Sequence, residues 1–155
     1  MKSRPVVTAL VLLFTGALTL SFAQNANMGT WQLNEAKSKI PAGFPKNHTV
    51  VYAMAGDQVK VTVDGTAPDG SALHTEWTGK FDGKDYPLSG DPTADMRSYK
   101  QVNDHSLMLE SKKDGKVVNS AKIVVAPDGK TRTITLSAKD AKGMKVGSTA
   151  VYDRQ

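Results

Sequence analysis

The segment DGKDYPLSGDPTAD, residues 82–95, gathers four aspartates that could supply oxygen ligands to Ca²⁺. These are Asp82, Asp85, Asp91 and Asp95. Their spacing does not follow the Asp-x-Asp-x-Asp-Gly pattern of an EF-hand loop. Asp82 precedes Gly83 and Asp91 precedes a proline, which are turn sequences. We therefore predict no metal site and interpret the segment as a connection.

The remaining residues match no familiar catalytic pattern. The chain has no cysteine, no serine in a Gly-x-Ser-x-Gly setting, no phosphate-binding glycine loop and no dinucleotide fingerprint. The three histidines, at positions 48, 74 and 105, fall on separate predicted strands or turns, so a shared metal is not expected. We assign no catalytic residue and no cofactor.

A ligand site is predicted from the length of residues 82–95, because long connections in a chain of short hairpins are often lids or binding loops. Arg97 and Tyr99 follow it and share one strand face. If that face is interior, this pair could bind a carboxylate. The alternative is that Arg97 pairs with Asp91 or Asp95 on the outside. The predicted ligand-binding residues are Trp77, Tyr86, Leu88, Asp91, Asp95, Arg97 and Tyr99.

Turn chemistry and period-two patterns define the elements that must position these residues. Pro, Asp, Asn and Gly recur at short intervals after Gly29, and the runs between them alternate apolar and polar residues, as in RTITL, residues 132–136. This pattern is typical of antiparallel strands joined by hairpins. We predict strands near 29–33, 47–55, 58–66, 71–79, 96–102, 106–112, 116–126, 130–138 and 144–153, with a short additional candidate at 84–88.

The number of strands predicts an all-β domain. No long segment shows helical periodicity, although residues 34–40 could form one short turn that ends before Pro41. A sheet of about 8–10 strands with one apolar face must close or fold over, because open edges invite aggregation. An antiparallel up-and-down β-barrel is the first prediction, and a β-sandwich is the alternative.

The N-terminus predicts export. Lys2 and Arg4 precede an uncharged, mostly apolar stretch at 6–20, and Ser21 and Ala23 suit cleavage after Ala23. This stretch is shorter than the roughly 20 residues of a membrane span. We predict a signal peptide at 1–23, a single barrel domain at 24–155, and a periplasmic or secreted location without a membrane span after cleavage.

The predicted mature chain is mildly basic, with a net charge of +3, because all 15 acidic and 18 of the 20 basic residues lie in it. The two signs alternate along the chain, which indicates a solvated surface. A basic run with interleaved aromatics is missing, so we predict no nucleic-acid partner. Without cysteine, packing alone must hold the exported domain together.

The two termini carry a resemblance. GTWQL, residues 29–33, opens the first strand, and VYDRQ, residues 151–155, ends the last. This resembles the calycin superfamily of lipocalins and fatty-acid-binding proteins, in which a Gly-x-Trp begins the barrel and a basic residue of the last strand packs over the Trp. The resemblance implies that Arg154 covers Trp31, a cation–π contact of about 0.5–2 kcal/mol.

The wider pattern GTWQLNEAKSK, GKFDGKDYPLSGDP, DGKTRTITL and YDRQ is similar to a group of small secreted bacterial proteins, as found in acidobacteria. These proteins are described as lipocalin-like and have no assigned activity. The resemblance implies the fold and the export, and it brings no activity with it.

Three functions remain open. The first is an exported, non-enzymatic protein that binds a small apolar or amphipathic ligand. The alternative is an envelope interaction protein, such as a hydrolase inhibitor that acts through the 82–95 loop. An enzyme would have to use Asp91 or Asp95 with His74 or Arg97 as acid–base groups.

Overall fold

The computed structural model describes residues 25–140 and 142–155, and the predicted leader lies outside this part. The described residues form ten strands and one short 3₁₀ helix, η1 (Glu35–Lys37). The strands are β1 (Gly29–Leu33), β2 (Lys46–Ala55), β3 (Gln58–Thr66), β4 (Ala72–Gly79), β5 (Tyr86–Ser89), β6 (Met96–Asn103), β7 (Ser106–Lys113), β8 (Lys116–Val125), β9 (Thr131–Lys139) and β10 (Lys145–Arg154).

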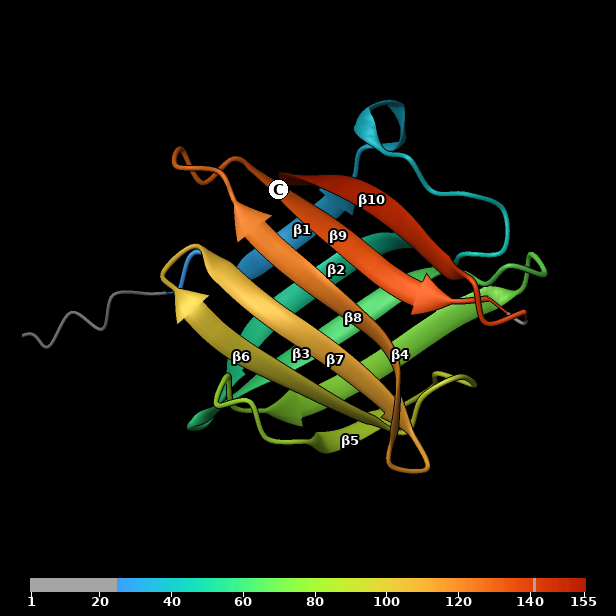
Figure 1. The fold of residues 1–155 in the computed structure, drawn as a ribbon. Coiled ribbons are helices and arrows are strands. Elements are labelled where there is room, and N and C mark those ends of the chain that lie inside the picture. Colours follow the sequence, from blue (N-terminus) through green and yellow to red (C-terminus); the bar gives the residue numbers. More distant parts are fainter. Residues whose placement is uncertain (1–24, 141) are drawn as a thin grey trace, which may run out of the picture.

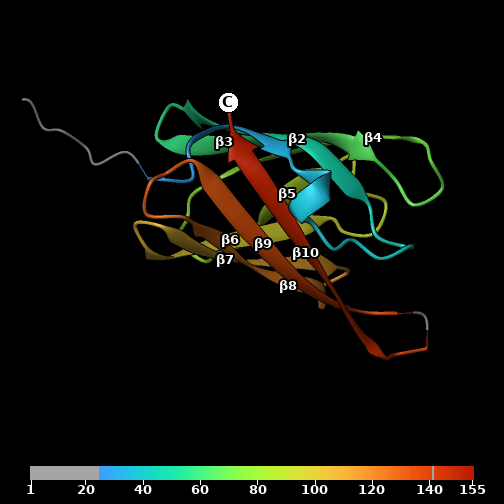
Figure 2. The same cartoon turned by 90° about the horizontal axis from the view of Figure 1, so that it is seen from above.

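The strands close into one antiparallel barrel (Figure 1). Each strand pairs with its neighbours in sequence, and β1 pairs with both β2 and β10, which completes the ring. Seen from above, β2–β4 form one wall and β6–β8 the opposite wall, and β9 and β10 cross between them (Figure 2). The predicted up-and-down barrel is confirmed, and the β-sandwich is wrong. The cause is β1, which hydrogen-bonds on both edges and leaves no open seam between two sheets.

The strand boundaries agree with the predicted ranges within one or two residues, because the turn residues limit where a strand can continue. Asp114 and Gly115 are the clearest case. Both have positive φ, 49° and 77°, which a two-residue type I′ hairpin requires. The predicted short turn after Asn34 is η1, whose first turn Asn34 caps by accepting a hydrogen bond from the Lys37 amide.

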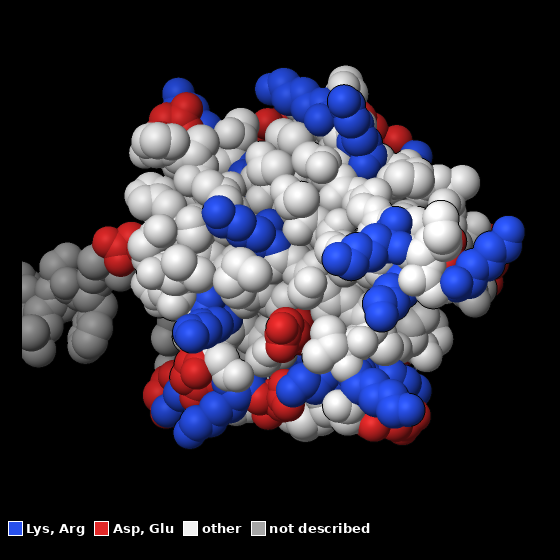
Figure 3. Space-filling model, in the orientation of Figure 1, with Lys and Arg blue, Asp and Glu red and all other residues white. Residues whose placement is uncertain are grey.

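Alternation puts one apolar face inside the barrel. On β4, Thr75 and Trp77 are buried, whereas His74 and Thr78 are exposed. On the face of the molecule in Figure 3, Lys and Arg lie among Asp, Glu and uncharged residues, as the alternating charges predict. Among the described residues, no helix has the length and hydropathy to cross a membrane.

The contact predicted between the termini closes one end of the barrel. Trp31 is fully buried, and the Arg154 guanidinium lies 4.3 Å from its ring centroid. Arg154 donates hydrogen bonds of 2.6 Å to the carbonyls of Met28, Ala26 and Gly129. A Cβ on Gly29 would lie 2.8 Å from Arg154 Nη1, which explains the glycine two residues before the Trp.

We expect Arg154→Ala to lower the free energy of unfolding by about 1 to 3 kcal/mol, because it removes a cation–π contact and three charge-assisted hydrogen bonds. Urea denaturation measures the change. Lys122→Ala removes an exposed cation from the outer face of β8 and serves as the matched control, with an effect within about 0.5 kcal/mol. Equal effects of the two substitutions would contradict the role of Arg154.

Candidate functional site

An aromatic cluster fills one side of the barrel interior. The Trp77 ring centroid lies 4.6 Å from that of Tyr99, 5.7 Å from that of Tyr86 and 6.3 Å from that of Phe81. Trp77 and Tyr99 are buried, and Tyr86 is half-buried. Gly79 makes this packing feasible, since a Cβ there would meet the Tyr86 ring at 2.5 Å. The predicted ligand residues Trp77, Tyr86 and Tyr99 therefore come together.

Arg97 faces the interior. It shares its strand face with the buried Tyr99, and its Nε donates a 3.0 Å hydrogen bond to Oγ of the buried Ser111. Its Nη2 lies 3.6 Å from the Asp91 carboxylate, and both side chains are largely buried, at 13 and 17 % exposure. The sequence offered two alternatives, an inward Arg97 or an ion pair with Asp91 on the outside. The structure combines them, because Asp91 lies over the interior.

The segment 82–95 is not one long loop, so its interpretation as a lid is wrong. Its middle forms β5, which pairs with β4 through Leu88 and Trp77 and with β6 through Tyr86 and Arg97. Its two ends are short turns at opposite ends of β5. The additional strand predicted at 84–88 therefore exists, displaced toward the C-terminus, because Tyr86 and Leu88 carry the buried face.

The four aspartates of this segment have separate partners. Asp82 accepts hydrogen bonds from the Lys84 amide and the Tyr86 hydroxyl. Asp91 accepts from the amide and hydroxyl of Thr93, as expected of a turn residue. The other two are Asp85, which pairs with Lys112 at 2.7 Å, and Asp95, which accepts from the Asp114 amide at 3.1 Å.

The predicted ligand site is thus brought together in part. Leu88 is buried opposite Trp77 and belongs to the interior group. Asp95 does not belong to it, because its carboxylate faces the β7–β8 turn. Among the described residues, no group of His, Asp and Glu has a geometry that could hold a metal.

Arg132 is the feature that the sequence reasoning missed. It lies on β9, is only 1 % exposed, and its guanidinium carbon is 4.8 Å from the Trp31 and Tyr52 ring centroids and 5.1 Å from that of Tyr152. The signal was available, because in RTITL Arg132 is in phase with Ile134 and Leu136 and not with the threonines. An arginine in the apolar phase of a strand must face the core.

The tyrosines around Arg132 remain neutral. Burial raises the pKa of Tyr52 far above its ordinary value of 10, against the opposing effect of the Arg132 charge. Burial also raises the pKa of Tyr152, to about 12, again opposed by Arg132. Neither phenol can therefore act as a tyrosinate counter-ion at neutral pH, and both present protonated hydroxyls.

The interior is accessible in the half of the barrel away from Trp31. Leu33, Leu73, Ile134 and Leu136 share strand faces with buried interior residues and are nevertheless only partly buried. We call this part the open half. A cleft of ≈ 580 Å³ lies at the same end, between the segment that contains Ile40 and Phe44 and the turn at 66–70.

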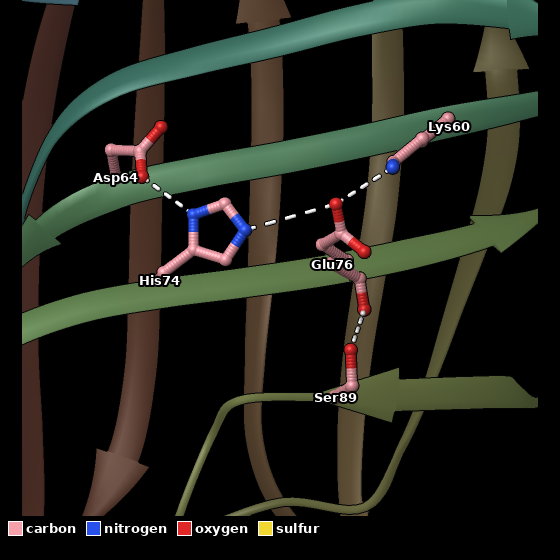
Figure 4. Close-up of polar contacts among 5 residues, drawn as sticks. All are labelled: Lys60, Asp64, His74, Glu76 and Ser89. Atoms are coloured by element: carbon pink, nitrogen blue, oxygen red, sulfur yellow. Dashed lines mark hydrogen bonds and ion pairs between the residues drawn. The ribbon is translucent and has the colours of Figure 1, made fainter.

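The outer face of β3 and β4 carries a separate polar group (Figure 4). His74 Nδ1 lies 2.6 Å from Asp64, and its Nε2 lies 3.7 Å from Glu76, which also pairs with Lys60 at 2.6 Å. Ser89 donates to the Glu76 carbonyl at 3.4 Å. The acid–base pairing of His74 with Asp91 or Asp95 is wrong, because alternation turns His74 outward, where its partners are Asp64 and Glu76.

Comparison with known proteins gives distant structural likenesses only. No family model and no curated protein matches the chain. The chain is similar to a redesigned β-barrel, mFAP1, solved with DFHBI bound, with TM-score 0.44 and 16 % identity over 85 % of this chain and 97 % of that chain. It is also similar to lobster apocrustacyanin A1, with TM-score 0.43 and 17 % identity over 85 % and 62 %. The barrel itself is established by the strand pairing of this chain.

We expect His74 to titrate above its ordinary pKa of 6.5, because Asp64 holds the protonated ring by a hydrogen bond. Asp64→Asn should lower this pKa, as measured by NMR of the imidazole, whereas Glu110→Gln, an exposed acid on β7, should not. Because the folded pKa is raised, the stabilisation is complete below about pH 6.5 and is lost as the pH rises through the folded pKa. An unchanged pKa in Asp64→Asn would contradict the pairing.

Proposed function

We propose that the protein is a non-enzymatic carrier that holds a small apolar or amphipathic ligand inside the open half of the barrel. The observation that carries this proposal is the partial exposure of apolar side chains that point inward, above all Ile134 and Leu136. Apolar residues that face a filled core are buried, as Ile123 and Leu107 are in the same barrel. Interior apolar surface that water can reach favours an apolar occupant.

The side chains next to this surface support room for a ligand. Ala121 lies opposite Leu136 on β8, and Ser148 lies opposite it on β10. Ala150 lies opposite Ile134. Small residues at these positions leave the interior of the open half wider than the closed end, where Trp31, Tyr52 and Tyr152 meet. Export is part of the proposal and rests on the leader predicted at 1–23.

The alternative of an envelope inhibitor has less support. It needs residues 82–95 as a protruding loop, and β5 uses the centre of that segment for sheet pairing. The interior site needs no such loop.

Leu136→Trp should fill the open half and weaken binding of the neutral dye N-phenyl-1-naphthylamine by at least about 10-fold, because an indole replaces the space that the dye needs. Fluorescence titration measures the dissociation constant. Thr135→Trp is the matched control, since it adds the same ring to the outer face of the same strand and should leave dye binding unchanged.

Native mass spectrometry of the protein purified from cells gives a second readout. A wild-type protein that binds no dye and carries no co-purified small molecule would overturn the proposed function. A dye that binds Leu136→Trp as tightly as wild type would move the ligand out of the barrel.

A further inference from the structure

Arg132 brings a positive charge into the barrel without a partner. Its Nε, Nη1 and Nη2 are all buried, and no residue in the described part of the chain accepts a hydrogen bond from them. A guanidinium carries five N–H donors in a planar fork. A buried charge without hydrogen bonds is strongly unfavourable, so a group with this surrounding calls for an acceptor.

The aromatic rings around Arg132 satisfy it only in part. The rings of Trp31, Tyr52 and Tyr152 lie within 4.8 to 5.1 Å of the guanidinium carbon, and their π faces attract the charge. They accept no strong hydrogen bonds, and the two phenols stay neutral. The positive charge therefore remains without an anion.

The barrel leads from Arg132 to the open half. Arg132, Ile134 and Leu136 occupy successive inward positions of β9, so an apolar surface extends from the guanidinium toward the accessible interior. On β10, Ala150 and Ser148 run alongside as small residues. A molecule in the open half would point one end at Arg132.

The charges inside the barrel also limit the ligand. The other inward guanidinium, Arg97, already has the Asp91 carboxylate at 3.6 Å and Ser111 as an acceptor. Arg132 thus leaves one positive charge to be matched. A carboxylate brings one negative charge, whereas a phosphate monoester brings about 1.5 to 2 at neutral pH.

We propose that Arg132 anchors an anion site at the closed end of the barrel, and that the ligand is an amphipathic monocarboxylate bound with its acid group innermost. The planar fork of Arg132 receives the carboxylate in a bidentate pair, and the apolar body lies along Ile134 and Leu136. This inference rests on the proposed function and names the class of its ligand.

The test is displacement of N-phenyl-1-naphthylamine from the purified chain by three ten-carbon probes: decanoate, decanol and decyl phosphate. For wild type we expect decanoate to bind about 10- to 100-fold more tightly than decanol, as hydrogen bonds to a charged group would give. Decyl phosphate should bind more weakly than decanoate. In Arg132→Met the preference for decanoate over decanol should fall to within about 3-fold, since only apolar contacts remain.

Two further variants make the result specific. Arg132→Lys keeps the charge but loses the fork, so it should weaken decanoate by about 10-fold and leave decanol unchanged. Lys122→Met removes the same charge from the outer face of β8 and should change neither. Thermal unfolding of each variant checks the fold, and the comparison of the three probes on wild type decides the proposal even if Arg132→Met does not fold.

The outcomes separate the two proposals. If no probe displaces the dye because the dye itself does not bind, the proposed function fails. If decanol and decanoate bind wild type equally, or Arg132→Met keeps the preference for decanoate, the carrier stands and the Arg132 site is overturned. Tighter binding of decyl phosphate than of decanoate overturns the assignment of a single carboxylate.

Discussion

The packing of two guanidinium groups on the Trp31 ring is the interaction on which the rest of the barrel depends. Arg154, from the last strand, lies 4.3 Å from the ring centroid, and Arg132, from β9, lies 4.8 Å from it. Arg154 also bonds the carbonyls of Met28 and Ala26 in the segment that leads into β1. The first and last strands are thereby tied together at the end of the barrel that is sealed.

This seal sets the polarity of the interior. Bulky aromatic rings occupy the closed end around Arg132, and smaller side chains such as Ala150 and Ser148 occupy the open half. One end therefore provides charge and the other provides apolar surface. An apolar residue in place of Arg132 would be the simpler solution for stability, because buried charges are expensive to desolvate. Its presence is easier to understand as part of a binding site.

The fold was predictable because its determinants are local. Turn residues such as Asp114 and Gly115 fix the hairpins, and the period-two pattern fixes which face of each strand is buried. The site was predictable only in part. The aromatic group around Trp77 and Tyr99 follows from strand phase, whereas the place of Asp91 beside Arg97 depends on the turn that follows β5.

The sequence by itself determined the strands, their turns and the pairing of Arg154 with Trp31, since each depends on residue type and spacing along the chain. Only the tertiary structure decided that residues 82–95 form a strand between two turns and that Arg132 is enclosed by three rings from β1, β2 and β10. The physical reason is closure. A ring of strands brings together side chains that are about 100 residues apart, and no local pattern records which of them share the interior.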